Sequence, residues 1–285
     1  YKGFLENNKL GFVTWPLLPT EANDEHPYFA KVEFTSELEE LVKTQKKVMV
    51  WLNDPAHNPT GLSMSEQGRI ACLETFVDSA LNNENVGHTL LIDSAYSLYA
   101  DEPFAWADTI LNEIENGMMW PDNLLICVAV SLSKSHTIYG LRTGALVSMH
   151  PEKEVTDRLD TVMSVTGRQT WSATPRVAQF CVSEMHSSEE GGKAWSDERD
   201  RLKDLLDNRR NILNSECEKL GVSINPTMDG FFAWIESSDP IAVAEKCAEN
   251  DVFLVPLNGG VRIGLCALPT DSIPKVAMAL SKAMS

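Results

Sequence analysis

Lys134 lies at the end of a predicted buried strand, a position where a lysine amine can become reactive. It ends the segment Ser131–Lys134, which follows the apolar run Asn123–Val130, and Arg142 comes eight residues later. Burial and a neighbouring cation both lower the pKa of a lysine, and a partly deprotonated lysine can form a Schiff base with a carbonyl compound. Taken alone, such a lysine is more often a solvated surface residue. The role of Lys134 therefore depends on what surrounds it.

Polar groups also follow two other apolar runs. Asp93 and Tyr96 come just after the run that ends at Ile92, and the segment Asn53–Gly61 follows Lys47–Leu52. In open α/β sheets, ligands bind outside the carboxyl ends of the strands. Each segment alone is a weak indication, since an aspartate after a strand is commonly a turn or capping residue. Three successive strand ends with polar groups, however, indicate one shared crevice.

Arg262 has a different setting, between Val261 and Ile263 in a predicted strand. A buried arginine is costly unless its guanidinium meets an anion. A carboxylate suits it well because it accepts two parallel hydrogen bonds from the guanidinium. An internal ion pair is the alternative to a bound ligand.

The elements that would position these residues alternate through the first two thirds of the chain. The predicted strands are Gly11–Leu18, Lys47–Leu52, Thr89–Ile92, Asn123–Val130 and Gly144–Met149. The predicted helices are Ser36–Thr44, Ser65–Leu81 and Pro103–Glu115. Continuous apolar strands separated by helices are typical of a parallel sheet covered on both faces. The predicted fold class is therefore α/β, with a mostly parallel sheet sandwiched by helices.

The composition changes near residue 187. Glu189–Lys219 is charged, with apolar residues on one helical stripe, and Gly221 follows it as a helix-ending residue. The later predicted elements are Gly230–Glu236 (strand), Pro240–Asn250 (helix), Val252–Pro256 and Val261–Leu265 (strands) and Ser272–Met284 (helix). We therefore expect a boundary between Ser187 and Trp195. Residues 1–190 would belong to the larger domain, and residues 191–285 would form a small C-terminal α+β domain.

Four segments together resemble the motifs of fold-type-I aminotransferases of the aspartate/aromatic type. Asn53–Gly61 is similar to the NPxxNPTG-type loop of this family, and Asp93–Tyr96 is similar to its D-x-A-Y segment. Ser131–Lys134, followed by Arg142, is similar to its S-x-S-K…R-x-G motif. Arg262 resembles the arginine of its small domain. The four occur in the family's order and cover nearly the whole chain, which chance would not explain.

The resemblance implies that the cofactor pyridoxal 5′-phosphate (PLP) is attached to Lys134. Asp93 would pair with the pyridine nitrogen and keep the ring an electron sink, while Tyr96 and Asn58 would hydrogen-bond the phenolic oxygen. The phosphate would be contacted by Ser131, Ser133 and Arg142. Arg262 would grip the substrate α-carboxylate. The peptide bond between Asn58 and Pro59 is expected to be cis.

Arg168 begins a segment that lies where the aspartate-type subgroup carries R-x-x-Y-S-N-P-P. The resemblance implies that Arg168 binds the distal carboxylate of a dicarboxylic substrate in the site of a neighbouring subunit, and hence that the protein is a homodimer. Trp171, Ala173 and Thr174 depart from the pattern, and a surface arginine is the alternative.

The predicted function is transfer of an amino group between an amino acid (aspartate/glutamate or aromatic) and a 2-oxo acid, with Lys134 moving the proton. Two alternatives stay open. One is another PLP enzyme on the same scaffold, such as a carbon–sulfur β-lyase or a cyclopropane-carboxylate synthase. The other is a non-catalytic aminotransferase-like domain that binds ligands. The family's phosphate-cradling loop and ring-stacking aromatic have no counterpart here, so we expect the chain, which starts at Tyr1, to be a piece of a longer protein.

The net charge and the spacing of the cysteines argue against several classes of binding partner. The formal net charge of −17 argues against nucleic acid and against anionic membrane surfaces, which bind clustered Lys and Arg. No apolar run approaches the length that spans a membrane. The six cysteines form no metal-ligand spacing with the six histidines. We therefore expect no metal site, buried free thiols, and a cytoplasmic protein of amino-acid metabolism.

Overall fold

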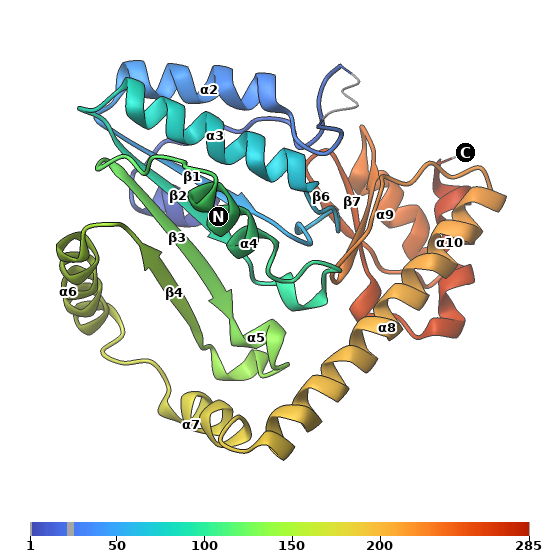
Figure 1. Ribbon diagram of the computed structural model, residues 1–285. Helices are drawn as coiled ribbons and strands as arrows, with labels where there is room; N and C mark the ends of the chain where they lie inside the picture. Colours follow the sequence, from blue (N-terminus) through green and yellow to red (C-terminus); the bar gives the residue numbers. More distant parts are fainter. Residues whose placement is uncertain (1, 22–25, 285) are drawn as a thin grey trace.

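The computed structural model describes residues 2–21 and 26–284. Its larger sheet has the strand order β1-β2-β3-β4, namely β1 (Lys47–Asn53), β2 (Gly87–Asp93), β3 (Leu124–Ser131) and β4 (Gly144–Met149). The first three strands run parallel, and β4 runs antiparallel to β3. Parallel neighbours need a crossover connection, which α3 (Glu66–Asn82) and α4 (Ala105–Glu115) provide. The carboxyl ends of β1, β2 and β3 consequently lie at one edge of the sheet (Figure 1).

Three helices pack on one face of this sheet. α2 (Lys31–Thr44), α3 and α4 bury Phe34, Phe76 and Trp106 against alternate residues of the strands. α3 begins after Ser65, whose hydroxyl accepts a hydrogen bond from the Gly68 amide at 3.1 Å and so satisfies one of the free donors of the first turn. The other face of the sheet is more open, because Met49 of β1 is 50% exposed and β4 has no buried residue.

A long helix connects the larger sheet to the second one. α6 (Lys153–Thr170) and α7 (Arg176–Met185) follow β4 and bury only Ala178. α8 (Glu189–Lys219) then runs for 31 residues, roughly 46 Å, from the end of α7 to the C-terminal elements. Figure 1 shows α8 running diagonally from the end of α7 to the elements around the second sheet.

The second sheet is antiparallel, with the order β5-β7-β6. Its strands are β5 (Phe232–Glu236), β6 (Val255–Leu257) and β7 (Gly260–Gly264). α9 (Pro240–Ala248), α10 (Ile273–Met284) and the C-terminal half of α8 pack around it and enclose a separate core, whose fully buried members include Leu213, Ile235, Ile263 and Leu280. Two apolar clusters therefore stabilise the molecule, one beside each sheet.

Six short elements make up the rest of the regular structure of the described residues. They are α1 (Lys2–Asn7), α5 (Leu132–Ser135) and the 3-10 turns η1 (Ser97–Tyr99), η2 (Tyr139–Leu141), η3 (Leu265–Ala267) and η4 (Thr270–Ser272). α5 starts directly after β3, so Lys134 sits on a single helical turn at the carboxyl edge of the sheet.

The fold class expected from the sequence is confirmed, with three differences. The predicted strand Gly11–Leu18 is not a strand, because this mostly exposed segment pairs with no other strand in the described ranges and holds only Trp15 against Phe34. α6 and α7 were not predicted. Two of the six free thiols, Cys181 and Cys266, are exposed rather than buried. Tyr1 lies outside the described residues.

Candidate active site

The loop after β1 is anchored to the end of β2 through Asn53. Its amide donates to the Asp93 carbonyl at 2.8 Å, and its Oδ1 accepts from the Asn58 backbone amide at 2.7 Å. The bonds before Pro55 and Pro59 are both cis, the latter as expected. These contacts fold the loop back over the sheet edge and bring the Asn58 side chain toward the residues that follow β2.

Tyr96 is buried beside this loop. Its ring packs edge-on against Phe231 and Phe232, at centroid distances of 5.3 and 5.6 Å, and its hydroxyl is hydrogen-bonded by the Asn58 side chain. Burial raises the pKa of Tyr96 to about 12, although the nearby Arg262 opposes this shift. The hydroxyl therefore keeps its proton at neutral pH.

Lys134 points into the same space. Its Nζ lies 5.4 Å from the centroid of the Tyr96 ring and 4.9 Å from that of Tyr139. Burial lowers the pKa of the Lys134 amine, and the cations Arg142 and Arg262 lower it further. Both features anticipated for a nucleophilic lysine, partial burial and nearby positive charge, are thus present.

Arg142 lies on the outer side of Lys134. It adopts a left-handed backbone conformation with φ 51°, donates to the Tyr139 carbonyl at 2.8 Å, and reaches Ser133 Oγ at 3.4 Å. Ser133 is buried, and Ser131 is the last residue of β3. One guanidinium and two hydroxyls consequently gather around α5, a donor set suited to a phosphate.

Arg262 comes from the second sheet and closes the site from the other side. Its guanidinium lies over the Phe232 ring at 4.4 Å and donates to Asn58 Oδ1 at 3.0 Å. Because Oδ1 is used in this way, the amide nitrogen of Asn58 is the group left to face Tyr96. Arg262 makes no ion pair within the described residues, so its charge remains available to an anion.

Asp93 ends β2, where its carboxylate accepts a hydrogen bond from the Ala95 amide at 3.2 Å. His57 is its electrostatic neighbour: burial lowers the pKa of His57 to about 4, and the charge of Asp93 partly offsets that effect. His57 is therefore neutral at physiological pH, with its Nδ1 held 2.9 Å from Thr60 Oγ1.

Arg168 is the predicted site residue that the single chain does not bring to the others. It lies in the last turn of α6, its side chain is exposed, and it makes no hydrogen bond or ion pair to any residue in 2–21 or 26–284. In Figure 1, α6 lies beside β4, away from α5 and β7.

Four contact residues were missed by the sequence reading. Tyr139 and Phe232 supply the rings beneath Lys134 and Arg262, while the His57 imidazole lies near Asp93 and the Cys266 thiol near Lys134. Tyr139 and His57 lie inside the recognised motifs and could have been noticed there. Phe232 and Cys266 carry no local pattern, because they come from segments that only the fold brings near.

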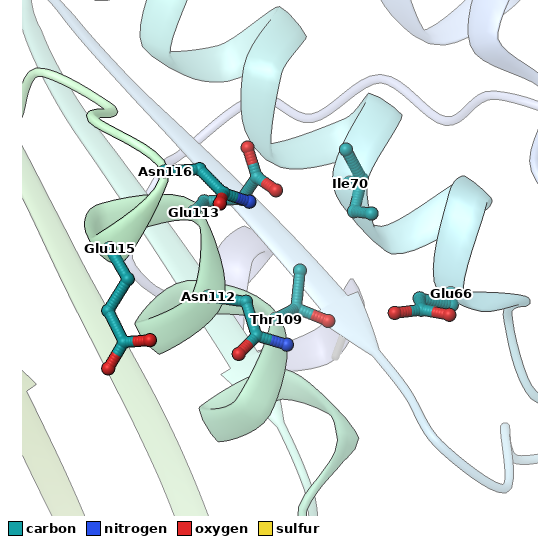
Figure 2. Close-up of a pocket in the computed structure, with 7 residues that line it drawn as sticks. All are labelled: Glu66, Ile70, Thr109, Asn112, Glu113, Glu115 and Asn116. Carbon is teal, nitrogen blue, oxygen red and sulfur yellow. The ribbon is translucent and has the colours of Figure 1, made fainter.

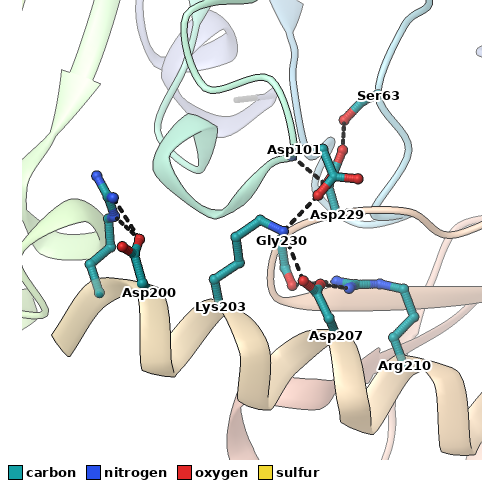
Figure 3. A network of polar contacts seen from close by, with 9 residues as sticks. Ser63, Asp101, Asp200, Lys203, Asp207, Arg210, Asp229 and Gly230 are labelled. Atoms are coloured by element: carbon teal, nitrogen blue, oxygen red, sulfur yellow. Dashed lines mark hydrogen bonds and ion pairs between the residues drawn. The ribbon is translucent and has the colours of Figure 1, made fainter. Parts of the chain in front are cut away.

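Behind the loops that carry Asn58 and Tyr96, a polar network connects them to α8 (Figure 3). Asp229 accepts from Ser63 Oγ at 2.5 Å and from the Asp101 amide at 3.0 Å. Lys203 of α8 bridges Asp101 and Asp207 at 2.6 and 2.8 Å. The second sheet and α8 are thereby held against both loops.

Two hollows lie outside the crevice. One, of about 190 Å³, lies between α3 and α4, where Glu66, Glu113 and Glu115 line it (Figure 2). The other, of about 370 Å³, is lined partly by Ser63, Arg69 and Asp229. Neither includes Lys134 or Arg262. In the ranges described, no helix is long and apolar enough to cross a membrane, and no three His, Cys, Asp or Glu side chains are grouped to hold a metal.

A parallel α/β sheet with a lysine-bearing turn at its carboxyl edge, faced by an arginine from a small antiparallel sheet, defines the class of protein. The chain matches the family described as aminotransferase class I and II over residues 5–280 and belongs to it.

Relatives of known function cover most of the chain. It is 26% identical over 256 residues to an aromatic-amino-acid aminotransferase of Paracoccus denitrificans, covering 87% of this chain and 60% of that protein. It is 27% identical over 260 residues to the cytoplasmic aspartate aminotransferase of Gallus gallus, covering 87% and 57%. The chain thus spans about 60% of the length of these relatives.

Solved structures agree on the fold. An aminotransferase from Anaerococcus prevotii superposes with a TM-score of 0.89 at 24% identity, over 100% of this chain and 66% of that one. An aromatic-amino-acid aminotransferase from Burkholderia pseudomallei, covalently bound to pyridoxal phosphate, gives a TM-score of 0.76 at 20% identity, over 100% and 67%.

Proposed function

We propose that the protein uses PLP to transfer an amino group between an amino acid and a 2-oxo acid. The observation that carries this proposal is the convergence of Lys134, Tyr96 and Asn58 from the larger sheet with Arg262 from the smaller one. The named activities of the relatives, and the PLP bound to the Burkholderia structure, support it.

The residues present fit this cofactor. Lys134 offers an amine of lowered pKa, and Asp93 a carboxylate at the strand end. Arg142, with Ser131 at the end of β3 and Ser133 of α5, offers a set of phosphate donors. When bound, PLP supplies the electron sink that delocalises charge from the substrate α-carbon. The Asp93 carboxylate would face the ring nitrogen, and the Tyr96 hydroxyl with the Asn58 amide would face the phenolic oxygen.

In the proposed reaction the chain's own groups orient the substrate and move one proton. Arg262 would receive the α-carboxylate, exchanging its bond to Asn58 Oδ1 for a two-pronged contact with the substrate. The Lys134 Nζ, neutral after its displacement by the substrate amine, would take the proton from the α-carbon and return it to the cofactor side. The buried rings of Tyr96 and Phe232, which meet edge-on, would limit water on their side of that transfer.

Assembly and specificity belong to the same proposal. We propose that Arg168, exposed on α6, serves the site of a second copy in a homodimer and favours dicarboxylic substrates, and that the protein works in the cytoplasm. We also propose that residues 1–190 and 191–285 act as two domains, because each sheet has its own apolar core and α8 bridges them. If Arg168→Ala left the kinetics with aspartate intact while Arg262→Ala did not, the dicarboxylate role would be wrong.

The decisive experiment is a visible absorption scan of the protein with PLP, compared with Lys134→Ala and with Lys153→Ala as a control at an exposed lysine of α6. We expect wild type and the control to show a visible band that aspartate bleaches and an oxo acid restores, and Lys134→Ala to show none. A band that responds only to aromatic amino acids would change the substrate class. A band that responds to sulfur amino acids with loss of sulfur would identify a β-lyase instead, and the absence of any band would contradict PLP binding at this site.

A further inference from the structure

Two histidines meet on the surface between α5, α7 and α8. His136 follows α5 and His186 follows α7, and their Nε2 atoms are 3.1 Å apart. His136 is partly covered and His186 is exposed. The two imidazoles come from parts of the chain that are 50 residues apart, so the fold itself creates this pair.

The hydrogen bonds around the pair favour one tautomer of each ring. Ser135 Oγ donates its one hydrogen to the Ser131 carbonyl at 3.1 Å, and it therefore accepts at its 2.8 Å contact with His136 Nδ1. His136 consequently carries its proton on Nδ1, and its Nε2 has a free lone pair. That lone pair accepts from His186 Nε2.

The distance between the two Nε2 atoms, now spanned by a hydrogen bond, is also compatible with a shared metal ion. Imidazole nitrogens bind zinc at about 2.0–2.1 Å, so two of them on one ion stand about 2.9 Å apart at a right angle and about 3.4 Å apart at a tetrahedral angle. The observed 3.1 Å falls between these values. On binding, the His186 proton would only have to move from Nε2 to Nδ1, without any change in net charge.

We propose that His136 and His186 together bind one divalent transition-metal ion of the zinc type through their Nε2 atoms, with water in the remaining positions. Water is needed because no third His, Cys, Asp or Glu of the described ranges joins the pair. The bond from His136 Nδ1–H to Ser135 is the kind of outer contact that orients metal-binding histidines. The ion would tie α5, which carries Lys134, to the end of α7.

The rings are already held in place. Trp195 of α8 stacks on His136 at 4.8 Å with an interplanar angle of 17° and meets His186 edge-on at 4.8 Å. The start of α8 lies close to His186, since a Cβ added at Gly192 would come within 3.7 Å of its Nδ1. Pre-positioned ligands lose little entropy when the ion binds.

The charge of the surroundings is also compatible with a cation. Arg199 lies over the Trp195 ring at 5.2 Å, but its guanidinium is paired with Asp200 at 2.5 Å. The net charge of −17 attracts divalent cations to the whole molecule.

The test is titration calorimetry of the untagged, chelator-treated protein with Zn²⁺, repeated with Co²⁺ while the absorption spectrum is recorded. Wild type should bind one ion, and His136→Ala and His186→Ala should each weaken binding at least tenfold. His150→Ala is the matched control, because His150 is partly exposed and hydrogen-bonded to the Asp122 carbonyl at 3.0 Å but has no histidine partner among the described residues. Circular dichroism would confirm that the variants fold.

Spectra separate this site from adventitious binding by thiols. Co²⁺ on imidazole and water gives weak visible bands, whereas a bound thiolate adds strong near-ultraviolet charge-transfer absorption. Cys181→Ser, at an exposed thiol of α7, should therefore leave binding unchanged. Wild-type protein that binds no ion saturably, binding that survives His186→Ala, or binding that disappears in Cys181→Ser would each overturn the proposal.

Discussion

The Asn58 side chain links the two sheets by hydrogen bonds. One atom of its side-chain amide accepts from Arg262 of β7, and the other serves Tyr96 after β2. A glutamine would be one methylene too long for both contacts, and an aspartate could not donate to Tyr96. The asparagine in this loop is thus explained by two simultaneous partners as well as by turn chemistry, which would also accept other residues.

Asp54 lies in the same loop as Asn58, and its burial leads us to predict that the stability of the fold depends on pH. Its carboxylate is almost fully buried and accepts from the Met64 amide at 2.7 Å and from Trp106 Nε1 at 2.8 Å. Burial nevertheless raises the pKa of Asp54 to about 6. Because the folded protein then holds this proton more tightly than the unfolded chain, the stabilisation is fully present below about pH 4 and is lost as the pH rises through 6, by up to about 3 kcal/mol.

Urea unfolding of wild type and Asp54→Asn between pH 4 and 7 would measure this effect. Asparagine cannot titrate, so the free energy of unfolding of the variant should depend less steeply on pH over that interval. Glu74→Gln serves as a control, since Glu74 of α3 is exposed. Parallel pH profiles for wild type and Asp54→Asn would show that Asp54 titrates normally.

Among the elements, α8 is held to the loop before β5 by one buried arginine. Arg210 is 3% exposed, pairs with Asp207 at 2.6 Å and donates to the Gly230 carbonyl at 2.6 Å, as Figure 3 shows. Arg210→Ala would leave a carbonyl and part of a carboxylate without partners, so we expect a loss of about 3 kcal/mol in the free energy of unfolding.

The matched control for this change is on the same helix. Arg201 pairs with Glu198 at 3.2 Å, but both side chains are exposed, and Arg201→Ala should change stability by no more than about 0.5 kcal/mol. Chemical unfolding of both variants would suffice as the measurement. Equal effects of the two substitutions would mean that the buried contacts of Arg210 do not stabilise the junction.

The loop between β1 and α3 requires a glycine at position 61. This residue has φ +73°, and an added Cβ would lie 2.3 Å from the Phe232 carbonyl oxygen. Gly61→Ala should therefore destabilise the fold by more than about 3 kcal/mol. Gly221, after α8, has φ +66° but open space around it, so Gly221→Ala should cost only about 1 kcal/mol. Thermal unfolding of the two variants is the measurement. Equal losses of stability in Gly61→Ala and Gly221→Ala would contradict this account.

Elements with their own apolar periodicity were predictable, and elements shaped by distant contacts were not. Glu189–Lys219 was predicted with the bounds that α8 has, because its apolar stripe and the following glycine mark it locally. The run Gly11–Leu18 looked like a strand but finds no strand to pair with in the part of the chain that the structure describes. α6 has an exposed, mixed sequence without a buried stripe. In the site, the motifs indicated Lys134, whereas the ring under Arg262 comes from a segment that only the fold brings there.

At the scale of the whole molecule, acidic charge and exposed apolar area coexist. Large apolar side chains of β4, α6 and α7 are more than 40% exposed, and we call them the β4–α7 face: Leu146, Val147, Val162, Met163, Val165, Val177 and Phe180. An exposed apolar patch commonly marks a contact with another chain, and these seven side chains are the candidates for such a contact. The net charge of −17 opposes any association between copies. Whether copies pair should therefore depend on how strongly that charge is screened.

Sedimentation velocity over a range of salt concentrations tests the proposed homodimer on this basis. Charges interact over about 30 Å at 0.01 M salt and about 3 Å at 1 M, so repulsion between copies fades while apolar contact does not. Starting from the chain mass of 31.6 kDa, we expect a discrete species of twice that mass to grow with salt, and Phe180→Glu in α7 to suppress it. A single species of 31.6 kDa at every salt concentration would contradict the homodimer, and a broad distribution of masses would mean that the β4–α7 face is merely adhesive. A discrete dimer lost in Phe180→Glu would instead place this face in the subunit contact and make the neighbouring Arg168 available to a second copy.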